Sequence, residues 1–96
     1  MSKYILLLNW TEQGVKTVKE SAARYDAAKD VAKSAGCTLE SIHMTFGPYD
    51  LVCVLDAPND EAAATFNLRV TSGGSVRGLT LKAFPEAEYR RIIAGV

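Results

Sequence analysis

Cysteine, histidine and net charge are all scarce in this sequence of 96 residues, and the shortages exclude whole classes of protein. Cys37 and Cys53 show no Cys-x-x-Cys spacing, and two cysteines are too few for a disulfide framework. Eleven basic residues balance eleven acidic ones. No basic surface is therefore expected to neutralise the phosphates of a nucleic acid, and no nucleic-acid partner is predicted.

Long hydrophobic runs are missing as well. The opening segment, MSKYILLLNW, has one lysine and a short apolar run. That run is too short for the core of a signal peptide and far too short to span a bilayer. With reduced thiols and no membrane partner expected, the protein is predicted to be cytoplasmic.

Cofactor fingerprints are also lacking. The glycine-rich segment SGGS, Ser72 to Ser75, does not follow the G-x-G-x-x-G pattern. It precedes a predicted strand, whereas a phosphate cradle opens a helix. The segment is therefore interpreted as a helix stop, and no cofactor is predicted.

The patterns that are present alternate between strand and helix within a single domain, residues 1–96. A strand is expected from Lys3 to Asn9, because KYILLLN is apolar on both alternating faces, as in a central strand. A helical period follows from Thr11 to Ala35, with Thr11 as cap, Ser21 as a second cap if the helix breaks, and Gly36 as stop. Its apolar stripe consists of Tyr25, Ala28, Val31, Ala32 and Ala35.

The middle of the chain predicts a β-hairpin and a second helix. The segment from Thr38 to Phe46 alternates as a strand, Gly47-Pro48 turns the chain, and Asp50 to Asp56 forms a strand that is apolar on both faces. Asn59 is positioned to cap a helix that Ser72-Gly73-Gly74 ends. In the first of these strands, Ile42, Met44 and Phe46 are expected on one face, and Ser41, His43 and Thr45 on the other.

The last part of the chain predicts a fourth strand from Ser75 to Phe84 and a short helix from Pro85, with Tyr89, Ile92 and Ile93 facing inward. The order is βαββαβ plus a terminal helix. Right-handed crossovers and one hairpin then give an α+β, ferredoxin-like fold. Its antiparallel sheet is ordered 4-1-3-2, and both long helices cover the same face.

This topology leaves the other face of the sheet without helices. The first and third strands are apolar there too, because YILLL and LVCVL are apolar at every position. A monomer would expose that patch to water, so the sheet is expected to pack against another copy of the chain. The predicted partner is the protein itself, as a homodimer or a higher homo-oligomer.

The same topology brings the end of the first strand and the starts of the third and fourth together at one rim, where Asn9, Trp10, Tyr49, Asp50 and Arg77 are expected. Asp50 is interpreted either as a turn residue that pairs with Arg77, or as a group that accepts a proton or hydrogen bond from a ligand beside Tyr49. Trp10 is a packing lid or a ligand platform. Arg77 clamps an anionic ligand or neutralises Asp50.

His43 is the only histidine in the chain. If the hairpin is tight, Cys53 lies nearly opposite His43 on the neighbouring strand and on the same face. A Cys-His pair suggests a nucleophile or half of a metal site, but no third ligand or orienting acid is evident. Packing roles are therefore favoured, no metal is predicted, and His43 is kept as a weak candidate for a metal or haem ligand.

Four blocks of residues, in this order, resemble the GYD domain family, which is named for a Gly-Tyr-Asp signature. The blocks are NWTEQG at residues 9–14, GPYDLV at 47–52, DAPNDEAAA at 56–64 and VRGLTLKAFPEAEY at 76–89. They span nearly the whole chain. The signature corresponds here to Gly47, Tyr49 and Asp50, with Pro48 between them, and the resemblance implies a functional role for these three residues.

The resemblance also implies membership of the group of small ferredoxin-like proteins called dimeric α/β barrels. That group includes cofactor-free monooxygenases, isomerases, haem-dependent enzymes and effector-binding domains. Two functions are therefore expected: a homo-oligomeric module that binds a small molecule or merely assembles, or a small enzyme that uses the rim of Tyr49 and Asp50. A small anionic or aromatic metabolite would be held by Asn9, Trp10, Gly47, Tyr49, Asp50 and Arg77.

Overall fold

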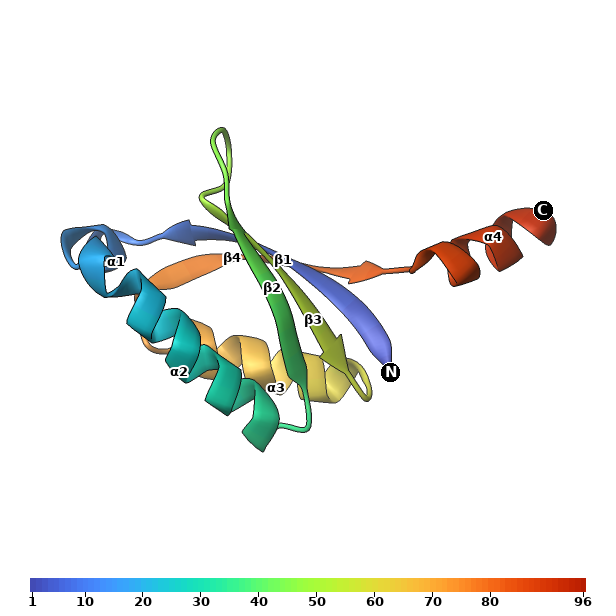
Figure 1. The fold of residues 1–96 in the computed structure, drawn as a ribbon, viewed down its shortest axis with the longest axis horizontal. Coiled ribbons are helices and arrows are strands. Elements are labelled where there is room, and N and C mark those ends of the chain that lie inside the picture. Colours follow the sequence, from blue (N-terminus) through green and yellow to red (C-terminus); the bar gives the residue numbers. More distant parts are fainter.

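The computed structural model describes residues 1–96 as four strands, four α-helices and one short 3-10 helix. The strands form one antiparallel sheet of order β2-β3-β1-β4, which confirms the predicted 4-1-3-2 order, counted from the other edge. The helices α2 and α3 lie on one side of this sheet (Figure 1). The elements are β1 (Ser2–Trp10), α1 (Glu12–Lys16), η1 (Val18–Glu20), α2 (Ser21–Ser34), β2 (Thr38–Met44), β3 (Leu51–Ala57), α3 (Asp60–Thr71), β4 (Val76–Ala83) and α4 (Glu86–Ala94).

The start of the first helical segment is fixed by a side-chain cap at Thr11. The Thr11 hydroxyl oxygen accepts a hydrogen bond from the Gly14 amide over 3.1 Å and so caps α1. The helix does break after Thr17, the case for which Ser21 was considered as a second cap, but Ser21 is the first residue of α2 and Glu20 occupies the cap position. A Cβ on Gly14 would lie 2.1 Å from the carbonyl oxygen of Ser75, so glycine is needed where α1 packs on the start of β4.

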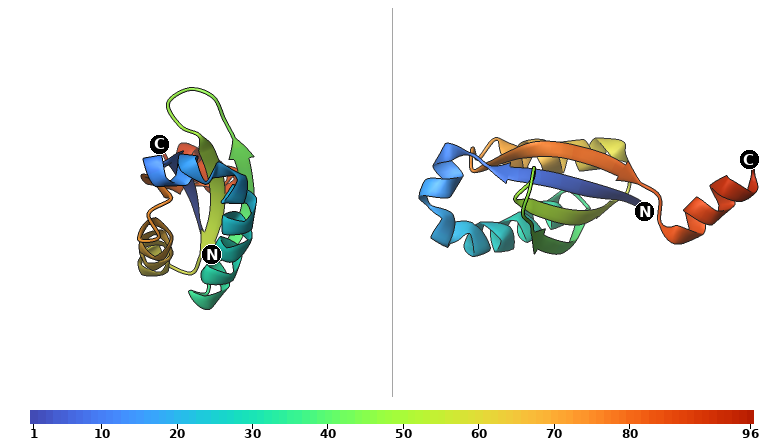
Figure 2. Two further views of the ribbon diagram at one scale, coloured as in Figure 1. Left: turned by 90° about the vertical axis from the view of Figure 1, so that its left-hand side faces the viewer. Right: turned by 90° about the horizontal axis from the view of Figure 1, so that it is seen from above.

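The core lies between the sheet and the two long helices. Side chains alternate along a strand, so one set of residues from β1 and β3 faces the helices and the other set does not. Figure 2 shows α2 and α3 on the same side of the sheet, with no helix on the other side. The buried core consists of Tyr4, Leu6, Leu8, Ala32, Cys37, Leu51, Cys53, Leu55, Ala57, Ala63 and Phe66.

The strand β2 is shorter than the sequence predicts. It ends at Met44, and residues 45–50 form a loop that rises from the sheet (Figure 1). Phe46 therefore does not share a strand face with Ile42, and the residue is 100% exposed. The physical reason is that Gly47 adopts a φ of +100° and that Pro48 has no amide hydrogen to donate, so neither residue continues an extended ladder.

The helix α4 differs most from the expectation. Tyr89, Ile92 and Ile93 were expected to face inward, but they are 56%, 49% and 56% exposed, and no residue of α4 is buried. The helix extends away from the sheet in Figure 1 and in the right-hand view of Figure 2. Only Phe84 and Pro85 separate it from β4, and the extended backbone of Pro85 (φ −58°, ψ 164°) directs it outward.

None of the helices combines the length and the apolar character that a membrane span requires.

Candidate functional site

The Gly-Tyr-Asp signature lies in the loop between β2 and β3. No atom lies within 4 Å of a Cβ built on Gly47, so its positive φ, and not close packing, requires glycine there. Two hydrogen bonds close the loop. The Thr45 hydroxyl donates to the Tyr49 carbonyl over 2.6 Å, and the Thr45 amide donates to the Asp50 carbonyl over 2.8 Å. The backbone of Tyr49 therefore fixes the shape of the loop.

Asp50 joins this loop to β1 in two ways. Its amide donates to the Leu8 carbonyl over 2.9 Å, and its Oδ2 accepts a hydrogen bond from the Trp10 amide over 3.0 Å. The β1–β3 ladder ends at the pair of Leu8 and Leu51, so Trp10 lies beyond it and finds no carbonyl in β3. The Asp50 carboxylate takes the place of that carbonyl.

Trp10 is tied in turn to the start of α2. Its indole Nε1–H donates to the Ser21 hydroxyl over 3.3 Å, and its half-buried ring packs against the core. A continuous set of contacts therefore runs from Asp50 through Trp10 to Ser21. Trp10 and Ser21 also line an open groove of about 410 Å³, together with Tyr25 of α2 and Met44 of β2.

Asn9 and Arg77 lie on the other side of the sheet. They are partners across β1 and β4, and strand alternation directs both away from the face to which Trp10 belongs. No ion pair joins Arg77 to Asp50, so the interpretation in which Arg77 neutralises Asp50 is not realised. The structure brings Trp10 and Asp50 together and separates them from Asn9 and Arg77.

His43 and Cys53 lie on opposite faces of the sheet, so the expectation that they share a face is wrong. His43 is opposite Val52, and Cys53 is opposite Ile42. A difference of one residue in register exchanges the two faces. Burial raises the pKa of the Cys53 thiol to about 11, which keeps it protonated and unreactive at neutral pH.

Nowhere in the chain do three or more His, Cys, Asp or Glu side chains lie close enough to hold a metal ion.

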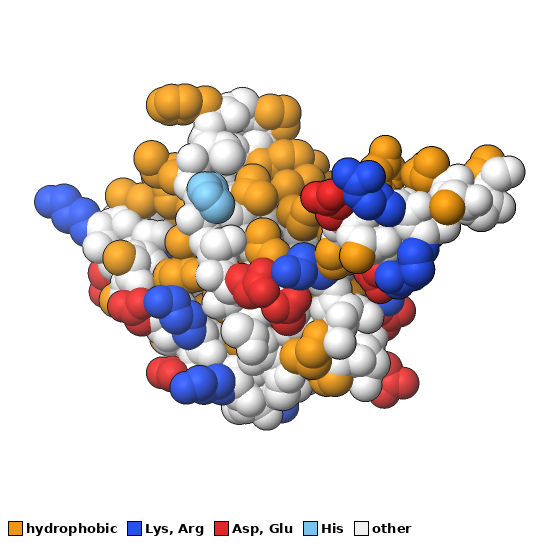
Figure 3. All heavy atoms as spheres, turned by 45° about the vertical axis from the view of Figure 1, so that its right-hand side comes forward, with side chains coloured by type: hydrophobic (Ala, Val, Ile, Leu, Met, Phe, Trp, Pro, Cys, Tyr) orange, Lys and Arg blue, Asp and Glu red, His pale blue; other side chains and the backbone are white.

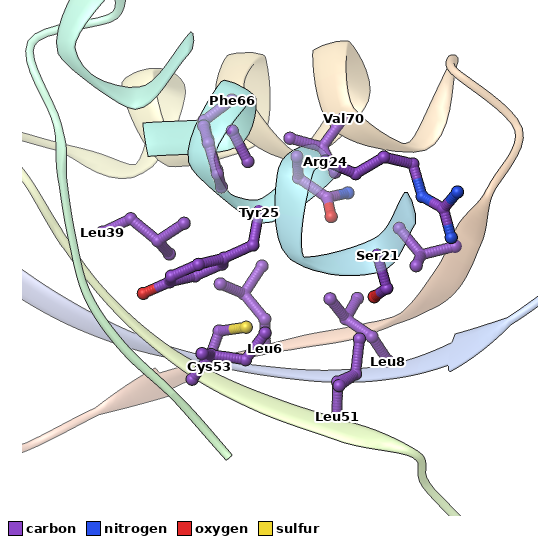
Figure 4. Close-up of a pocket in the computed structure, with 14 residues that line it drawn as sticks. Leu6, Leu8, Ser21, Arg24, Tyr25, Leu39, Leu51, Cys53, Phe66 and Val70 are labelled. Atoms are coloured by element: carbon purple, nitrogen blue, oxygen red, sulfur yellow. The ribbon is translucent and has the colours of Figure 1, made fainter. Parts of the chain in front are cut away.

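The helix side of the sheet contains a cavity that the sequence pattern did not predict. Its volume is about 70 Å³, and its lining comes mainly from α2, α3 and the three strands β1 to β3. In Figure 4 the Tyr25 ring and the Cys53 sulfur lie beside it, with Leu6 and Leu8 along the sheet. The cavity exists because α2 presents small side chains such as Ala28 there. The alanine-rich stripe of this helix was the signal in the sequence.

Few polar groups border this cavity. Arg24 lines it, but its guanidinium donates to the carbonyls of Thr17 over 3.0 Å and of Gly14 over 3.2 Å. The charge is therefore held by the turn between α1 and α2. Ser21 and Asn67 are the other polar residues of the lining that are not aromatic. Such a lining suits a very small apolar molecule and offers no free cation to an anionic one.

A polar cluster lies near the N-terminal end of β1 on the helix side. The Lys82 ammonium donates to Asp60 Oδ1 over 2.8 Å, and the hydroxyl of Tyr4 donates to the same oxygen. The hydrogen bond from Lys82, followed by that from Tyr4, lowers the pKa of Asp60. The bond to Asp60 raises the pKa of Lys82 and of Tyr4. This cluster ties the start of α3 to two strands.

The face without helices, called the open face here, is apolar across three neighbouring strands. Its residues Leu79 and Leu81 are 52% and 44% exposed. Figure 3 shows hydrophobic side chains gathered beside the single histidine. The pairing of the strands places six apolar residues on this face, which are Ile5, Leu7, Val52, Val54, Leu79 and Leu81.

Charged residues are confined to the border of the open face. At one end the Lys3 ammonium donates to Glu40 over 3.0 Å and lies 3.5 Å from Asp56. The bond to Glu40 is the main reason that the pKa of Lys3 is raised. At the other end lies Arg77. The apolar centre with a charged border is the arrangement found in protein–protein interfaces.

Comparison with known proteins agrees with the fold. The family model of the GYD domain matches residues 4–93. The chain is also similar to a protein from Thermus thermophilus described as "Glutamine synthetase and cystathionine beta-lyase binding protein". The two chains are 29% identical over 89 residues, which cover 92% of this chain and 94% of the relative.

Proposed function

The chain belongs to the GYD domain family, and on that premise we propose that it is a small cytoplasmic binding module that associates with itself through the open face and binds a partner enzyme. The open face is the observation that carries this proposal. Binding is favoured over catalysis because the Asp50 carboxylate already accepts a hydrogen bond from the Trp10 amide of the same chain.

The open face has the properties of a self-association surface. Its six apolar residues lie on adjacent strands, and the nearest charges, those of Lys3, Asp56 and Arg77, lie at its ends. Contiguous apolar patches of this kind on small proteins mark interaction sites. Two such sheets packed about 10 Å apart would cover each other. Because the same surface meets itself, the pair closes as a two-fold dimer.

Light scattering at micromolar concentration tests this self-association. We expect the wild-type protein to be a dimer or a higher oligomer and Leu81→Glu to be a monomer, because Leu81 lies opposite Ile5 on the open face and is 44% exposed. Leu68→Glu is the matched control, since Leu68 of α3 is 66% exposed on the helix side. A monomeric wild-type protein would contradict the proposal.

The partner enzyme is proposed from the relative. The relative is named for binding glutamine synthetase and cystathionine beta-lyase. An enzyme of the same kind would bind to surfaces that remain free when two open faces are paired. Surface plasmon resonance tests the binding of a partner enzyme, with glutamine synthetase and cystathionine β-lyase purified from the organism to which this protein belongs. Saturable binding to one of them is expected. If neither enzyme binds, the proposal of an enzyme partner is wrong, whereas the proposal of self-association is unaffected.

The cavity between α2, α3 and the sheet favours a second function, the binding of a very small apolar molecule. Xenon and krypton under pressure are suitable probes in a thermal-shift experiment, because the lining is almost entirely apolar and a cavity of about 70 Å³ is too small for benzene. Ala28→Met, which fills the cavity, is the control. The proposal expects stabilisation of the wild-type protein and none of the variant. Equal shifts for both proteins would mean that the probes bind elsewhere.

The enzymatic alternative, with Tyr49 and Asp50 acting on a ligand, remains a prediction. A haem-dependent version of it would use His43, and the absorption spectrum of the purified protein tests that version directly. A Soret band that His43→Ala removes would favour haem.

A further inference from the structure

The helix α4 lacks a covering surface. It has nine residues, none of them buried. Isolated helices shorter than about 12 residues are marginal in water, so a helix of this length needs a surface to pack on. Tyr89, Ile92 and Ile93 have the i, i+3, i+4 spacing that forms one apolar stripe. Phe84, just before the helix, is also exposed.

The charged side chains of α4 form ion pairs with one another. Arg90 pairs with Glu86 over 2.8 Å, and Arg91 pairs with Glu88 over 3.9 Å. Two acids and two bases leave the helix without net charge. The surface that covers α4 must therefore match the apolar stripe, and neither an acidic nor a basic patch is required.

A matching apolar surface lies at the opposite end of the sheet. Phe46, in the loop of the β2–β3 hairpin, is 100% exposed, and Pro48 beside it is exposed as well. The hairpin rises from the side of the sheet opposite α2 and α3 (Figure 1). It lies beside Leu8, whereas β4 leads into α4 beside Lys3. These points are about 17 Å apart along β1, and α4 points away from the sheet, so one copy cannot bring them together.

We propose that α4 is an arm that packs its apolar stripe on the β2–β3 hairpin of a second copy of the chain. The inference rests on the proposed self-association through the open face. A two-fold axis that lies between two open faces and crosses the strands places opposite ends of the sheets together. Each copy then gives one arm and receives one.

This arrangement accounts for most of the apolar surface that the chain exposes. Of the 13 exposed large hydrophobic residues, eight lie on the open face, in the hairpin loop or in the arm and its flanks. The dimer would cover all three regions in one interface. Those eight residues are Phe46, Leu79, Leu81, Phe84, Tyr89, Ile92, Ile93 and Val96.

Disulfide trapping between two single variants tests the arm. Phe46→Cys protein is mixed with Ile92→Cys protein and oxidised; the native Cys37 and Cys53 are buried and do not compete. We expect a covalent pair that contains one copy of each variant. Leu68→Cys mixed with Ile92→Cys is the control, because Leu68 lies on α3, on the helix side, and should give little product. If the two mixtures react equally, the arm does not bind the hairpin.

Ile92→Glu provides a second measurement by sedimentation. The dissociation constant of the dimer should rise at least about tenfold, because a buried isoleucine is replaced by a charge. Arg90→Gln, on the polar side, should leave it unchanged, and circular dichroism should show that the sheet and α2 persist in both variants. An unchanged constant for Ile92→Glu overturns the arm alone. A monomeric wild-type protein overturns the arm together with the proposed self-association.

Discussion

The two faces of the sheet are built from the same strands and the same kinds of residue, yet the chain covers only one of them. In β1, Leu6 and Leu8 are buried beneath the helices, whereas the adjacent Ile5 and Leu7 remain half-buried on the open face. The difference shows that an apolar pattern in the sequence indicates which strand faces need to be buried. The pattern does not indicate whether the same chain or another molecule buries them.

The cover on the helix side is itself incomplete. The helices contribute the small Ala32 and Ala63, together with Phe66, to the core. The cavity of about 70 Å³ remains between them and the sheet. The open face has no cover from its own chain, and α4, the most detached helix, contributes nothing to the core. The contrast between the two faces leads to four predictions.

The largest effect is expected from a pair of substitutions in β3. Leu55 is fully buried, so Leu55→Ala should lower the free energy of unfolding by about 2–5 kcal/mol. Val54, its neighbour on the open face, is half-buried, and Val54→Ala should cost about 1 kcal/mol or less in a dilute monomer. Urea denaturation at two protein concentrations measures both, and the cost of Val54→Ala should rise with concentration. Equal costs in dilute solution would mean that one chain covers both faces.

The second prediction concerns Asp50, which bonds to the end of β1. At that end the side chain of Trp10 lies on the face that the helices cover, and the side chain of Asn9 lies on the open face. Asp50→Ala removes the acceptor for the Trp10 amide and should cost about 1–2 kcal/mol. Asp50→Asn keeps an oxygen acceptor and should cost clearly less. Thermal denaturation followed by the fluorescence of Trp10 measures both. Equal losses would show that the negative charge, and not the acceptor atom, holds Trp10.

The third prediction tests the incomplete packing of the covered face. Ala28→Met should raise the free energy of unfolding by about 1 kcal/mol, because methionine is a good helix former and adapts to irregular cavities. Ala27 is exposed on the same helix, so Ala27→Met should leave stability almost unchanged. Chemical denaturation compares the two variants. A loss of stability in Ala28→Met would show that the helices already pack tightly on the sheet.

The smallest effects are expected from the ion pairs that border each face, because these groups are exposed to solvent. The pKa of Asp60 is held below its ordinary value of 3.8, so its contribution to stability is present above that pH and is lost as the pH falls through the folded value. The pKa of Lys3 is raised above 10.5, so its contribution is present below that pH and is lost as the pH rises through the folded value.

Melting temperature as a function of pH separates the two borders. Asp60→Asn should flatten the acid side of the profile and also lower its alkaline side, because Asp60 raises the pKa of Lys82 and of Tyr4. Glu40→Gln should flatten the alkaline side alone. If Glu40→Gln changes the acid side, or if Asp60→Asn leaves the acid side unchanged, the assignment of the two clusters is wrong.

Much of the fold was predictable because its determinants are local. The strand periods, the break in the first helical segment and the order βαββαβ all follow from residues within a few positions of one another. The cap at Asn59 is confirmed by a hydrogen bond of 2.9 Å from the Ala62 amide. Gly47 was predicted as a turn residue, and its positive φ confirms the prediction.

The candidate site was less predictable because it depends on contacts between distant segments. The sequence placed Trp10 and Asp50 at the same rim, but the bond between the Asp50 carboxylate and the Trp10 amide depends on where the β1–β3 ladder ends. The face of His43 depends on the hairpin register, in which one residue exchanges the faces. The cavity depends on how closely α2 packs on the sheet.

By itself, then, the sequence determined the elements, their order and the presence of two apolar faces, because side-chain alternation and helix caps are properties of short segments. Only the tertiary structure decided which face the helices cover, that the Asp50 carboxylate completes a strand ladder, and that α4 extends away from the sheet with none of its residues buried. The physical reason is that burial depends on which surfaces come into contact. The apolar stripe of Tyr89, Ile92 and Ile93 has the same sequence pattern whether it packs against its own chain or against a second copy.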